Sequence, residues 1–264
     1  MNKPIIAMVA VVIAAGLGVW YYLEQPKMPP AASASAKLQP PAAAPAPPPI
    51  KYPLPQSATP SAQTASLPAL NHSDAELGGA LGELIGAAAV RNYLVPEDLI
   101  RHIVATIDNL PRRHLPVQKR PVAAAPGTFM AQGDNEHARL DPQNYARYVP
   151  MVEVIRNLDM QKLAGLYFRF YPLFQSAYQH LGYPDGYFND RLIAVIDVLL
   201  AAPQPAAPIT LVRPNVLYQF ADPQLEARPA GQKLLIRIGP DNAAVVKAKL
   251  TELRAALTAA PIRH

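Results

Sequence analysis

The pattern of hydrophobic and polar positions divides the chain into three parts, of which the first is the simplest. Residues 4–23 are 20 consecutive uncharged, mostly apolar positions. A helix of this length is about 30 Å long, which matches the hydrocarbon core of a bilayer. Trp20, Tyr21 and Tyr22 lie at its far end, where aromatic rings favour the headgroup region. We therefore expect a transmembrane helix over residues 4–23 that acts as an anchor, preceded by a short cytoplasmic N-terminus, residues 1–3.

A cleaved signal peptide is the alternative interpretation of the same segment. The apolar run exceeds the usual h-region of roughly 7–15 residues, and the small-residue cleavage candidates at 32–36 come about ten residues too late. Lys3 and the α-amino group precede the run, so the positive-inside rule favours a cytoplasmic N-terminus by about one charge. In a Gram-negative bacterium, this predicts a single-pass protein of the inner membrane with its C-terminal domain in the periplasm.

Residues 24–70 have the composition of a disordered Pro/Ala-rich linker. Thirteen of these 47 residues are proline, and most of the others are alanine, serine, threonine or glutamine. Such a sequence favours polyproline II and has few apolar side chains to offset the entropy of ordering. We expect a semi-rigid tether that reaches on the order of 145 Å when extended. A proline-rich ligand for a partner protein is the less favoured alternative.

From residue 71 to residue 264 the pattern becomes that of one compact, mainly helical domain. Ser73 and Glu76 have the spacing of a capping box, and Pro96 suits the first position of a second helix. Further helices are expected to start at Asp141, Asp159 and Asn189. The apolar residues that follow recur at helical spacing: Leu77, Leu81 and Leu84; Leu99, Ile103 and Ile107; Leu163, Phe170 and Phe174; Leu192, Ile196 and Leu199.

Shorter extended pieces interrupt these helices. Residues 112–140 lose the helical period and carry prolines and a turn sequence, which predicts an extended excursion or a poor hairpin. Two β-prone runs follow at 209–212 and 216–220, and a helical turn is expected after Asp222. The segment 232–238 is ambiguous, and a last helix carries these apolar residues: Val246, Leu250, Leu253 and Leu257. The fold class is therefore mainly α, with a small extended or β component.

Composition and charge narrow the chemistry of this domain. The chain has no cysteine, which excludes disulfides and thiol nucleophiles. The formal net charge is +5, but residues 1–70 hold four lysines and one glutamate, so +3 of it lies outside the domain. Nucleic acid binding needs a concentrated basic face, so we expect no nucleic acid partner. The basic residues at 112–120 then indicate a solvated connection, with an anionic lipid or polymer ligand as the alternative.

Motifs for cofactors, metals and catalysis are missing from the sequence. Neither a P-loop pattern nor a strand-linked G-x-G-x-x-G occurs, and H-E-x-x-H and G-x-S-x-G are absent. The six histidines form no i, i+4 pair on one helix, so a zinc site has too few candidate ligands. We therefore predict no cofactor and no metal, and the catalytic residues of any enzyme activity stay unassigned.

One constellation of aromatic and charged residues stands out. Eleven of the 18 Phe and Tyr residues lie between Tyr145 and Phe188, interleaved with arginines and aspartates. Helical spacing favours an aromatic core whose tyrosine hydroxyls and arginine stems reach the surface. The alternative is a groove that grips a peptide, glycan or carboxylate ligand, with these candidate ligand-binding residues: Arg169, Tyr183, Tyr187 and Arg191.

Seven short motifs follow one another along the domain: DNLPRR at 108–113, NYARY at 144–148, YPLF at 171–174, LGYP at 181–184, GYFNDRL at 186–192, FADP at 220–223 and GQKL at 231–234. Over roughly residues 75–260 the chain resembles an uncharacterised bacterial family, domain of unknown function 3014. The resemblance implies an N-terminal membrane anchor and a Pro/Ala-rich linker before the domain. It implies no activity, cofactor or site residue.

These features together favour a binding or scaffold role over catalysis. We expect a membrane-anchored envelope protein that presents its helical domain on a tether to an envelope protein or a cell-wall partner. The alternative is a tethered hydrolase acting on glycan or peptide, in which Asp185 and Asp190 would be the acid and base. Asp190 also fits a helix N-terminal charge and Asp185 a turn residue, which are the simpler interpretations. A solute-binding module is a third class and depends on the aromatic groove.

Overall fold

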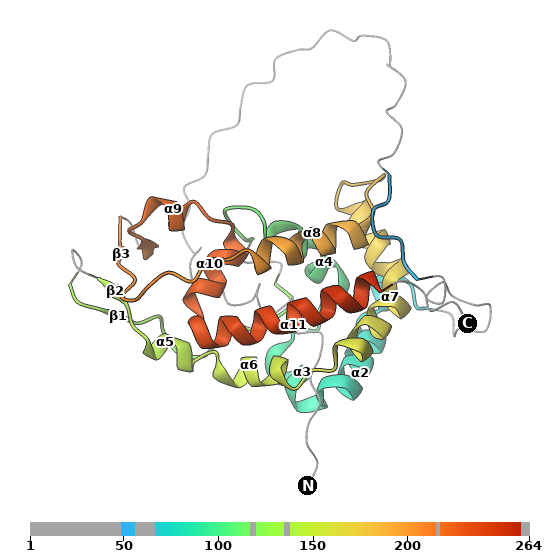
Figure 1. The fold of residues 1–264 in the computed structure, drawn as a ribbon. Helices are drawn as coiled ribbons and strands as arrows, with labels where there is room; N and C mark the ends of the chain where they lie inside the picture. The colour runs from blue at the N-terminus through green and yellow to red at the C-terminus, as the bar shows by residue number, and fades with distance from the viewer. Residues whose placement is uncertain (1–48, 56–66, 117–119, 135–137, 215–216, 260–264) are drawn as a thin grey trace, which may run out of the picture.

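A computed structural model describes residues 49–55, 67–116, 120–134, 138–214 and 217–259 (Figure 1). The predicted anchor at 4–23 and most of the predicted linker lie outside these ranges. Within the described residues, no helix combines the length and the apolar character that crossing a membrane requires.

Helices make up most of the described chain, and two small sheets complete it. A 3₁₀ turn, η3, covers Leu70–His72. The α-helices are α2 Asp74–Ile85, α3 Ala87–Tyr93, α4 Leu99–Asn109, α5 Gln143–Ala146, α6 Val149–Arg156, α7 Met160–His180, α8 Phe188–Leu200, α9 Pro223–Glu226, α10 Ala230–Arg237 and α11 Pro240–Thr258. The strands are β1 Ala131–Gln132, β2 Arg139–Leu140, β3 Leu211–Val212 and β4 Gln219–Phe220. The predicted fold class, a mainly helical compact domain with a small β component, is confirmed.

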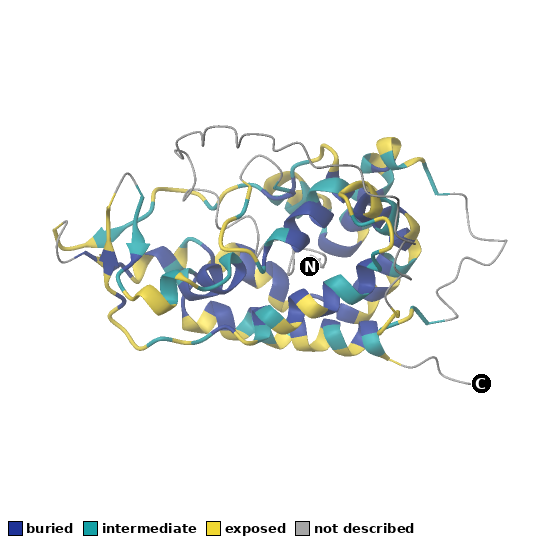
Figure 2. Cartoon of the chain, turned by 90° about the horizontal axis from the view of Figure 1, so that it is seen from above, coloured by how far each residue is buried: buried dark blue, intermediate teal, exposed yellow. Residues whose placement is uncertain are grey.

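Two long helices, α7 and α11, organise the packing. Helix α7 packs against α2, α4, α8 and α11, and α11 also packs against α6, α8 and α10. Their buried faces meet in one main core, drawn dark blue between the helices in Figure 2. The apolar faces predicted from helical spacing line this core: Leu77, Leu81, Ile103, Ile107, Phe170, Phe174, Ile196, Leu199 and Leu250 are each at most 3% exposed.

The two sheets lie together at one end of the molecule, beside α9 (Figure 1). Strands β1 and β2 pair antiparallel with Ala131 opposite Leu140, and β3 and β4 pair antiparallel with Leu211 opposite Phe220. A bridge between Arg139 and Thr210 links the two pairs. Their inward side chains form a second, smaller core that includes Leu140, Leu211 and Phe220. The extended pieces predicted around 112–140 and 209–220 are therefore confirmed as two minimal hairpins.

Helix starts were predicted correctly where the capping side chain acts on its own helix. The Asp159 carboxylate accepts hydrogen bonds from the backbone N–H groups of Gln161 and Lys162 at the start of α7. Asp222 accepts from Gln224 N–H at the start of α9 in the same way. These contacts are local, so the sequence spacing was enough to predict them.

The predicted capping box at Ser73 is wrong. The Ser73 hydroxyl donates instead to the carbonyl oxygen of Leu70, at 2.9 Å. The next residue, Asp74, does act as a cap, but for a different helix. Its carboxylate accepts from the backbone N–H of Asp98 at 2.9 Å and of Leu99 at 2.8 Å. Asp74 therefore caps α4 from a neighbouring helix, and α4 begins at Leu99 rather than at Pro96.

Replacing Asp74 with alanine is expected to lower the free energy of unfolding by about 1 kcal/mol, the usual effect of a lost N-cap. Thermal and chemical denaturation followed by circular dichroism would measure it. Glu83→Ala is the matched control, because Glu83 is an exposed carboxylate near the C-terminal end of the same helix. That control is expected to leave stability unchanged or slightly raised. Equal loss in the two variants would show that Asp74 does not cap α4.

Two pieces of the predicted linker contact the folded domain. Residues 49–55, blue in Figure 1, run beside the loop between α7 and α8, and Leu54 packs on the main core. Leu67 and Leu70 pack on the same core farther along the chain. For these residues the expectation of a free linker is corrected: specific hydrogen bonds and apolar contacts, which composition does not reveal, fasten them to the domain.

Candidate functional site

The residues singled out from the sequence gather where α7 ends and α8 begins. The connecting loop and the first turn of α8, residues 181–191, carry Tyr183, Asp185, Tyr187, Asp190 and Arg191. The fourth candidate ligand-binding residue, Arg169, lies one helix away, and its guanidinium pairs with Glu76 of α2. The structure thus brings most of the candidates to one end of α8.

The aromatic side chains behind this loop form the core that helical spacing favoured. Phe174 of α7 and Phe188 of α8 stack with ring centroids 5.9 Å apart, and Tyr178 stacks on Tyr183 at 4.6 Å. Tyr167 and Tyr171 are also buried. Burial raises the pKa of both phenols, so they stay protonated and can donate hydrogen bonds. The interpretation as an aromatic core is confirmed for these residues.

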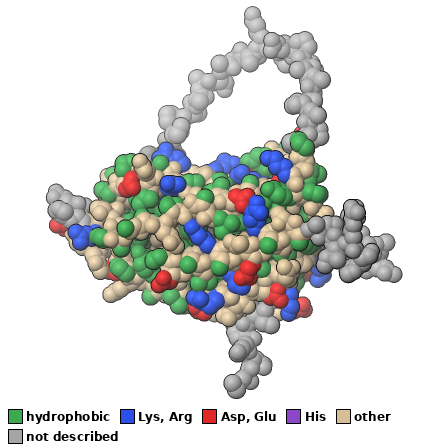
Figure 3. Space-filling view, viewed as in Figure 1, with side chains coloured by type: hydrophobic (Ala, Val, Ile, Leu, Met, Phe, Trp, Pro, Cys, Tyr) green, Lys and Arg blue, Asp and Glu red, His purple; other side chains and the backbone are tan. Residues whose placement is uncertain are grey.

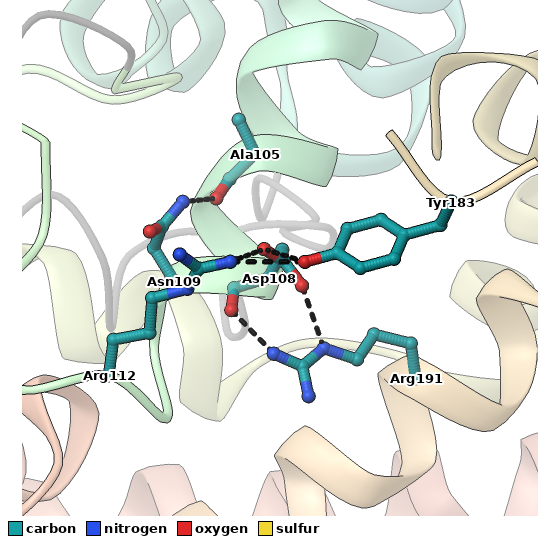
Figure 4. A network of polar contacts seen from close by, with 6 residues as sticks. All are labelled: Ala105, Asp108, Asn109, Arg112, Tyr183 and Arg191. Atoms are coloured by element: carbon teal, nitrogen blue, oxygen red, sulfur yellow. Dashed lines mark hydrogen bonds and ion pairs between the residues drawn. The ribbon is translucent and has the colours of Figure 1, made fainter. Parts of the chain in front are cut away.

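Asp108, near the C-terminal end of α4, ties α4 to α8 and the loop (Figure 4). Its side chain is 2% exposed, and we call Asp108, Arg112, Tyr183 and Arg191 the Asp108 cluster. Arg191 Nε donates to Asp108 Oδ1 at 3.0 Å, and an Arg191 amino group donates to the Asp108 carbonyl oxygen at 2.6 Å. Arg112 and the Tyr183 hydroxyl donate to Oδ2 at 2.7 and 3.2 Å. Both carboxylate oxygens are therefore satisfied, as a buried charge requires.

The Asp108 cluster uses two of the four candidate ligand-binding residues for internal contacts. The Asp108 carboxylate raises the pKa of Arg112, so the guanidinium keeps its charge. Sequence reasoning placed Asp108 in a family motif without assigning it a role. The sequence did carry a signal for a buried ion pair. Asp108 follows Val104 by four residues on an apolar helix face, where an acidic side chain needs a partner.

A second set of contacts lies beside the first, on residues that neighbour Arg191 along the chain. The Asp190 carboxylate accepts from the backbone N–H of Lys51 at 2.9 Å and of Tyr52 at 2.8 Å. The Asn189 amide donates to the Tyr52 carbonyl oxygen at 2.8 Å, and the Tyr187 hydroxyl accepts from Leu54 N–H at 3.1 Å. The start of α8 therefore holds a segment of the linker more than 130 residues away in sequence.

The predicted capping role of Asn189 is wrong, and the simpler interpretation of Asp190 is confirmed. Helix α8 begins at Phe188, so Asn189 lies inside its first turn, where its side chain contacts Tyr52 and accepts from the Tyr167 hydroxyl at 3.2 Å. Asp190 is the acidic residue of that first turn, as expected for a helix N-terminal charge. Ligand binding by the four candidate residues stays a prediction. Tyr183 and Arg191 lie in the Asp108 cluster, whereas Arg169 contacts Glu76 and Tyr187 contacts Leu54.

The arrangement of Asp185 and Asp190 does not favour acid–base chemistry. Asp185 is exposed in the loop. The Asp190 carboxylate is occupied by the backbone N–H groups of Lys51 and Tyr52. A general acid or base needs a carboxyl within hydrogen-bond reach of the substrate proton. The tethered hydrolase therefore gains no support from this pair.

A buried ion pair near the sheets was not foreseen in the sequence. Lys233 Nζ lies 2.7 Å from Glu226 Oε1 and also donates to the Glu226 carbonyl oxygen at 3.1 Å. Burial lowers the pKa of Lys233, and the nearby carboxylate partly opposes this shift. Burial also lowers the pKa of the His114 imidazole, and the charge of Lys233 lowers it further. The sequence pattern of 232–238 fitted both a helix and a strand, so the ion pair could not be predicted from it. Lys233 is buried because this segment forms part of α10.

Charge elsewhere on the molecule is mixed. Acidic and basic side chains are interspersed with hydrophobic ones on the face seen in Figure 3. Among the described side chains, no group of three or more His, Asp or Glu residues is placed to hold a metal ion. The Asp108 cluster and the contacts of Asp190 are therefore the two polar arrangements that distinguish the start of α8.

Comparison with known proteins finds one family. The family model described as "Protein of unknown function (DUF3014)" matches residues 99–254. This range begins with α4 and ends within α11, so it contains the whole Asp108 cluster as well as Tyr187, Asn189 and Asp190. Neither the curated proteins nor the solved structures include a significant match.

Proposed function

The chain belongs to the DUF3014 family of proteins of unknown function, and we propose that it is a membrane-anchored binding module. Residues 4–23 would anchor it as a single pass in the inner membrane of a bacterial envelope. The domain would face the periplasm and act there by binding or scaffolding, with an envelope protein or cell-wall material as partner. No reaction is part of the proposal.

The observation that supports binding most directly is the contact between the start of α8 and residues 51–54. The side chains of Tyr187, Asn189 and Asp190 reach the backbone of residues 51–54 and satisfy its donors and an acceptor. Recognition of a peptide backbone by fixed side chains is what a peptide-binding module does. The other prominent cluster, around Asp108, is internally satisfied and serves to position this helix end.

The anchor and the tether follow from the length and composition of the N-terminal residues. The 20 uncharged positions at 4–23 suit a bilayer span, and 25 residues, 24–48, separate them from the segment bound at α8. A polyproline chain of that length reaches on the order of 75 Å. The domain would therefore bind partners well beyond the membrane surface.

Membrane orientation is tested by reporter fusions to the C-terminus of the full chain. A reporter active only in the periplasm is expected to be active, and one active only in the cytoplasm to be silent. Deleting residues 4–23 is expected to release the protein from the membrane fraction. The reverse reporter pattern would overturn the topology, and retention after the deletion would overturn the anchor.

Binding is tested by cross-linking the full chain in intact envelopes, followed by purification and identification of what is captured. The control carries residues 1–70 fused to an unrelated reporter, so that anchor and linker are matched. We expect the same envelope components to be enriched over this control in repeated experiments. A full chain that stays monomeric and captures nothing above the control would contradict the binding role.

A further inference from the structure

The segment at residues 51–54 is bound through every backbone donor that it has. Its three N–H groups belong to Lys51, Tyr52 and Leu54, and each is bonded to Asp190 or Tyr187. Pro53 carries no N–H, so it leaves no donor unsatisfied. The Tyr52 carbonyl oxygen accepts a hydrogen bond from the Asn189 amide. Such complete pairing is typical of a bound peptide rather than of a chance contact.

The side chains of the segment alternate between the domain and the solvent. Tyr52 and Leu54 are half-buried, whereas Lys51 and Pro53 are exposed. Leu54 packs against the main core, and the Tyr52 side chain interacts electrostatically with Arg254 of α11. Prolines at 49, 53 and 55 restrict φ along the backbone and reduce the entropy lost on binding. The segment thus offers one polar and one apolar anchor on a backbone with restricted φ angles.

The side chains that hold the segment are themselves fixed by the domain. Asn189 is fully buried and accepts from the Tyr167 hydroxyl, and the Tyr187 ring packs against that of Tyr171 with centroids 5.7 Å apart. Asp190 lies in the first turn of the 13-residue α8, where the helix dipole stabilises a negative charge. Arg254 is held by Asp197 at 2.6 Å. The receptor surface is therefore pre-organised, which lowers the cost of binding a ligand.

We propose that Tyr187, Asn189, Asp190 and Arg254 form a recognition site for peptides of the type Lys-Tyr-Pro-Leu, and that the linker of the same chain occupies it. The proposal rests on the proposed binding function and names its ligand chemistry. A ligand needs two consecutive N–H groups for the Asp190 carboxylate. The second of these belongs to a tyrosine whose side chain reaches Arg254, and a proline and a leucine for the apolar contact follow it.

Because residues 51–54 of the same chain occupy the site, they regulate the binding of other peptides to it. Residues 56–66 connect the bound segment to the domain, and a connection of about eleven residues gives an effective concentration on the order of millimolar. A peptide of the same chemistry from another protein must compete with this internal ligand. Its binding would free residues 49–55 and lengthen the tether, which couples ligand binding to the reach of the domain.

Protection of the segment is tested by trypsin cleavage of the full chain in detergent micelles. The bond after Lys51 is held by the Tyr52 N–H contact, and cleavage after Lys37 provides a reference within the same linker. In Asp190→Asn, one of the two N–H groups faces an amide NH₂ instead of an oxygen. We expect the ratio of cleavage after Lys51 to cleavage after Lys37 to rise about tenfold, corresponding to about 1.4 kcal/mol. Asp185→Asn, in the exposed loop, is the matched control and is expected to behave as wild type.

A second variant keeps this test independent of any folding defect in α8. Tyr52→Ala lies in the segment itself and is expected to raise the same ratio, with an unchanged circular dichroism spectrum and melting temperature. Equal ratios in wild type, Asp190→Asn and Tyr52→Ala would overturn the proposal. Protection that disappears on dilution would also overturn it, because the segment would then come from a second copy.

Recognition of a separate peptide is tested with a fluorescent heptapeptide of residues 49–55. The full chain carrying both Tyr52→Ala and Leu54→Ala is expected to bind it at least about tenfold more tightly than wild type, whose own segment competes. Adding Asp190→Asn, or replacing the peptide tyrosine by alanine, should weaken binding about tenfold. No binding to the folded double variant would overturn the recognition site. This assay contains no envelope partner, so its outcome is distinct from that of the cross-linking experiment.

Discussion

Asp108→Ala is expected to lower the free energy of unfolding by about 3 kcal/mol, which makes it one of the two largest effects predicted for this protein. The substitution removes a buried carboxylate that accepts from Arg191, Arg112 and Tyr183. The Arg112 side chain is 55% exposed and can turn to water, but that of Arg191 is 28% exposed and remains largely in place. Most of the loss therefore comes from the contact with Arg191. Urea denaturation of the full chain would measure it.

An exposed pair of the same chemistry provides the control. Asp197 lies 2.6 Å from Arg254 with 47% of its side chain exposed, so Asp197→Ala is expected to cost at most about 1 kcal/mol. A double-mutant cycle should give a larger coupling of Asp108 to Arg191 than to Arg112. If Asp108→Ala and Asp197→Ala had the same effect, the Asp108 cluster would not be the tie between α4 and α8 that its geometry indicates.

Glu226→Ala is expected to cost about 3 kcal/mol near neutral pH, and the cost is expected to shrink as the pH rises. The side chains of Lys233 and Glu226 are 5% and 17% exposed, so the variant removes a carboxylate 2.7 Å from a buried ammonium group. Burial already lowers the pKa of Lys233 in the folded protein, and Glu226 raises it. Without Glu226, the pKa of folded Lys233 falls further below its unfolded value.

The sign of the pH dependence follows from proton binding. Between the folded and the unfolded pKa of Lys233, the unfolded chain binds more protons than the native protein, so stability rises with pH across that window. Denaturation of Glu226→Ala at a series of pH values above 7 would show this recovery relative to wild type. Glu252→Ala is the control, because Glu252 lies at the same 2.7 Å from Lys249 but is 51% exposed. A cost for Glu226→Ala that is constant with pH would contradict a buried charged Lys233.

The helices were largely predictable because their signals are local. Apolar residues at spacings of three and four, as in Leu77, Leu81 and Leu84, are sufficient to define a face that must be buried. A capping carboxylate such as Asp159 acts on backbone groups two and three residues away. Pro150 likewise lies in the first turn of α6, where proline is tolerated, and marks its separation from α5.

The candidate site was only half predictable, because its partners are distant in sequence. The segment from Tyr183 to Arg191 was singled out for its aromatic and charged residues, and it does form the polar end of α8. Asp108, which lies 83 residues before Arg191, was missed as its partner. Asp74 was missed as a cap because it acts on a neighbouring helix. Pairings of this kind depend on which helices pack together, and no local pattern encodes that.

The linker shows most clearly the difference between local signals, which the sequence carries, and contacts between distant residues, which it does not. Its prolines restrict φ and remove hydrogen-bond donors whatever the surroundings, as Pro53 does between Tyr52 and Leu54. Composition alone favoured a free tether, because the segment has too few apolar side chains to fold by itself. Residues 51–54 are nevertheless held, because Asp190, Asn189 and Tyr187 supply the hydrogen bonds that the segment cannot make internally.

The sequence by itself determined the helical class of the domain and the buried face of each helix. These properties follow from the periodicity of apolar residues and from backbone restrictions that act over a few residues. Only the tertiary structure decided that Asp108 joins α4 to α8, that Lys233 is buried beside Glu226 and that the start of α8 binds residues 51–54. Each of these contacts joins residues whose proximity depends on how the whole domain packs, and burial then makes the pairing of their polar groups obligatory.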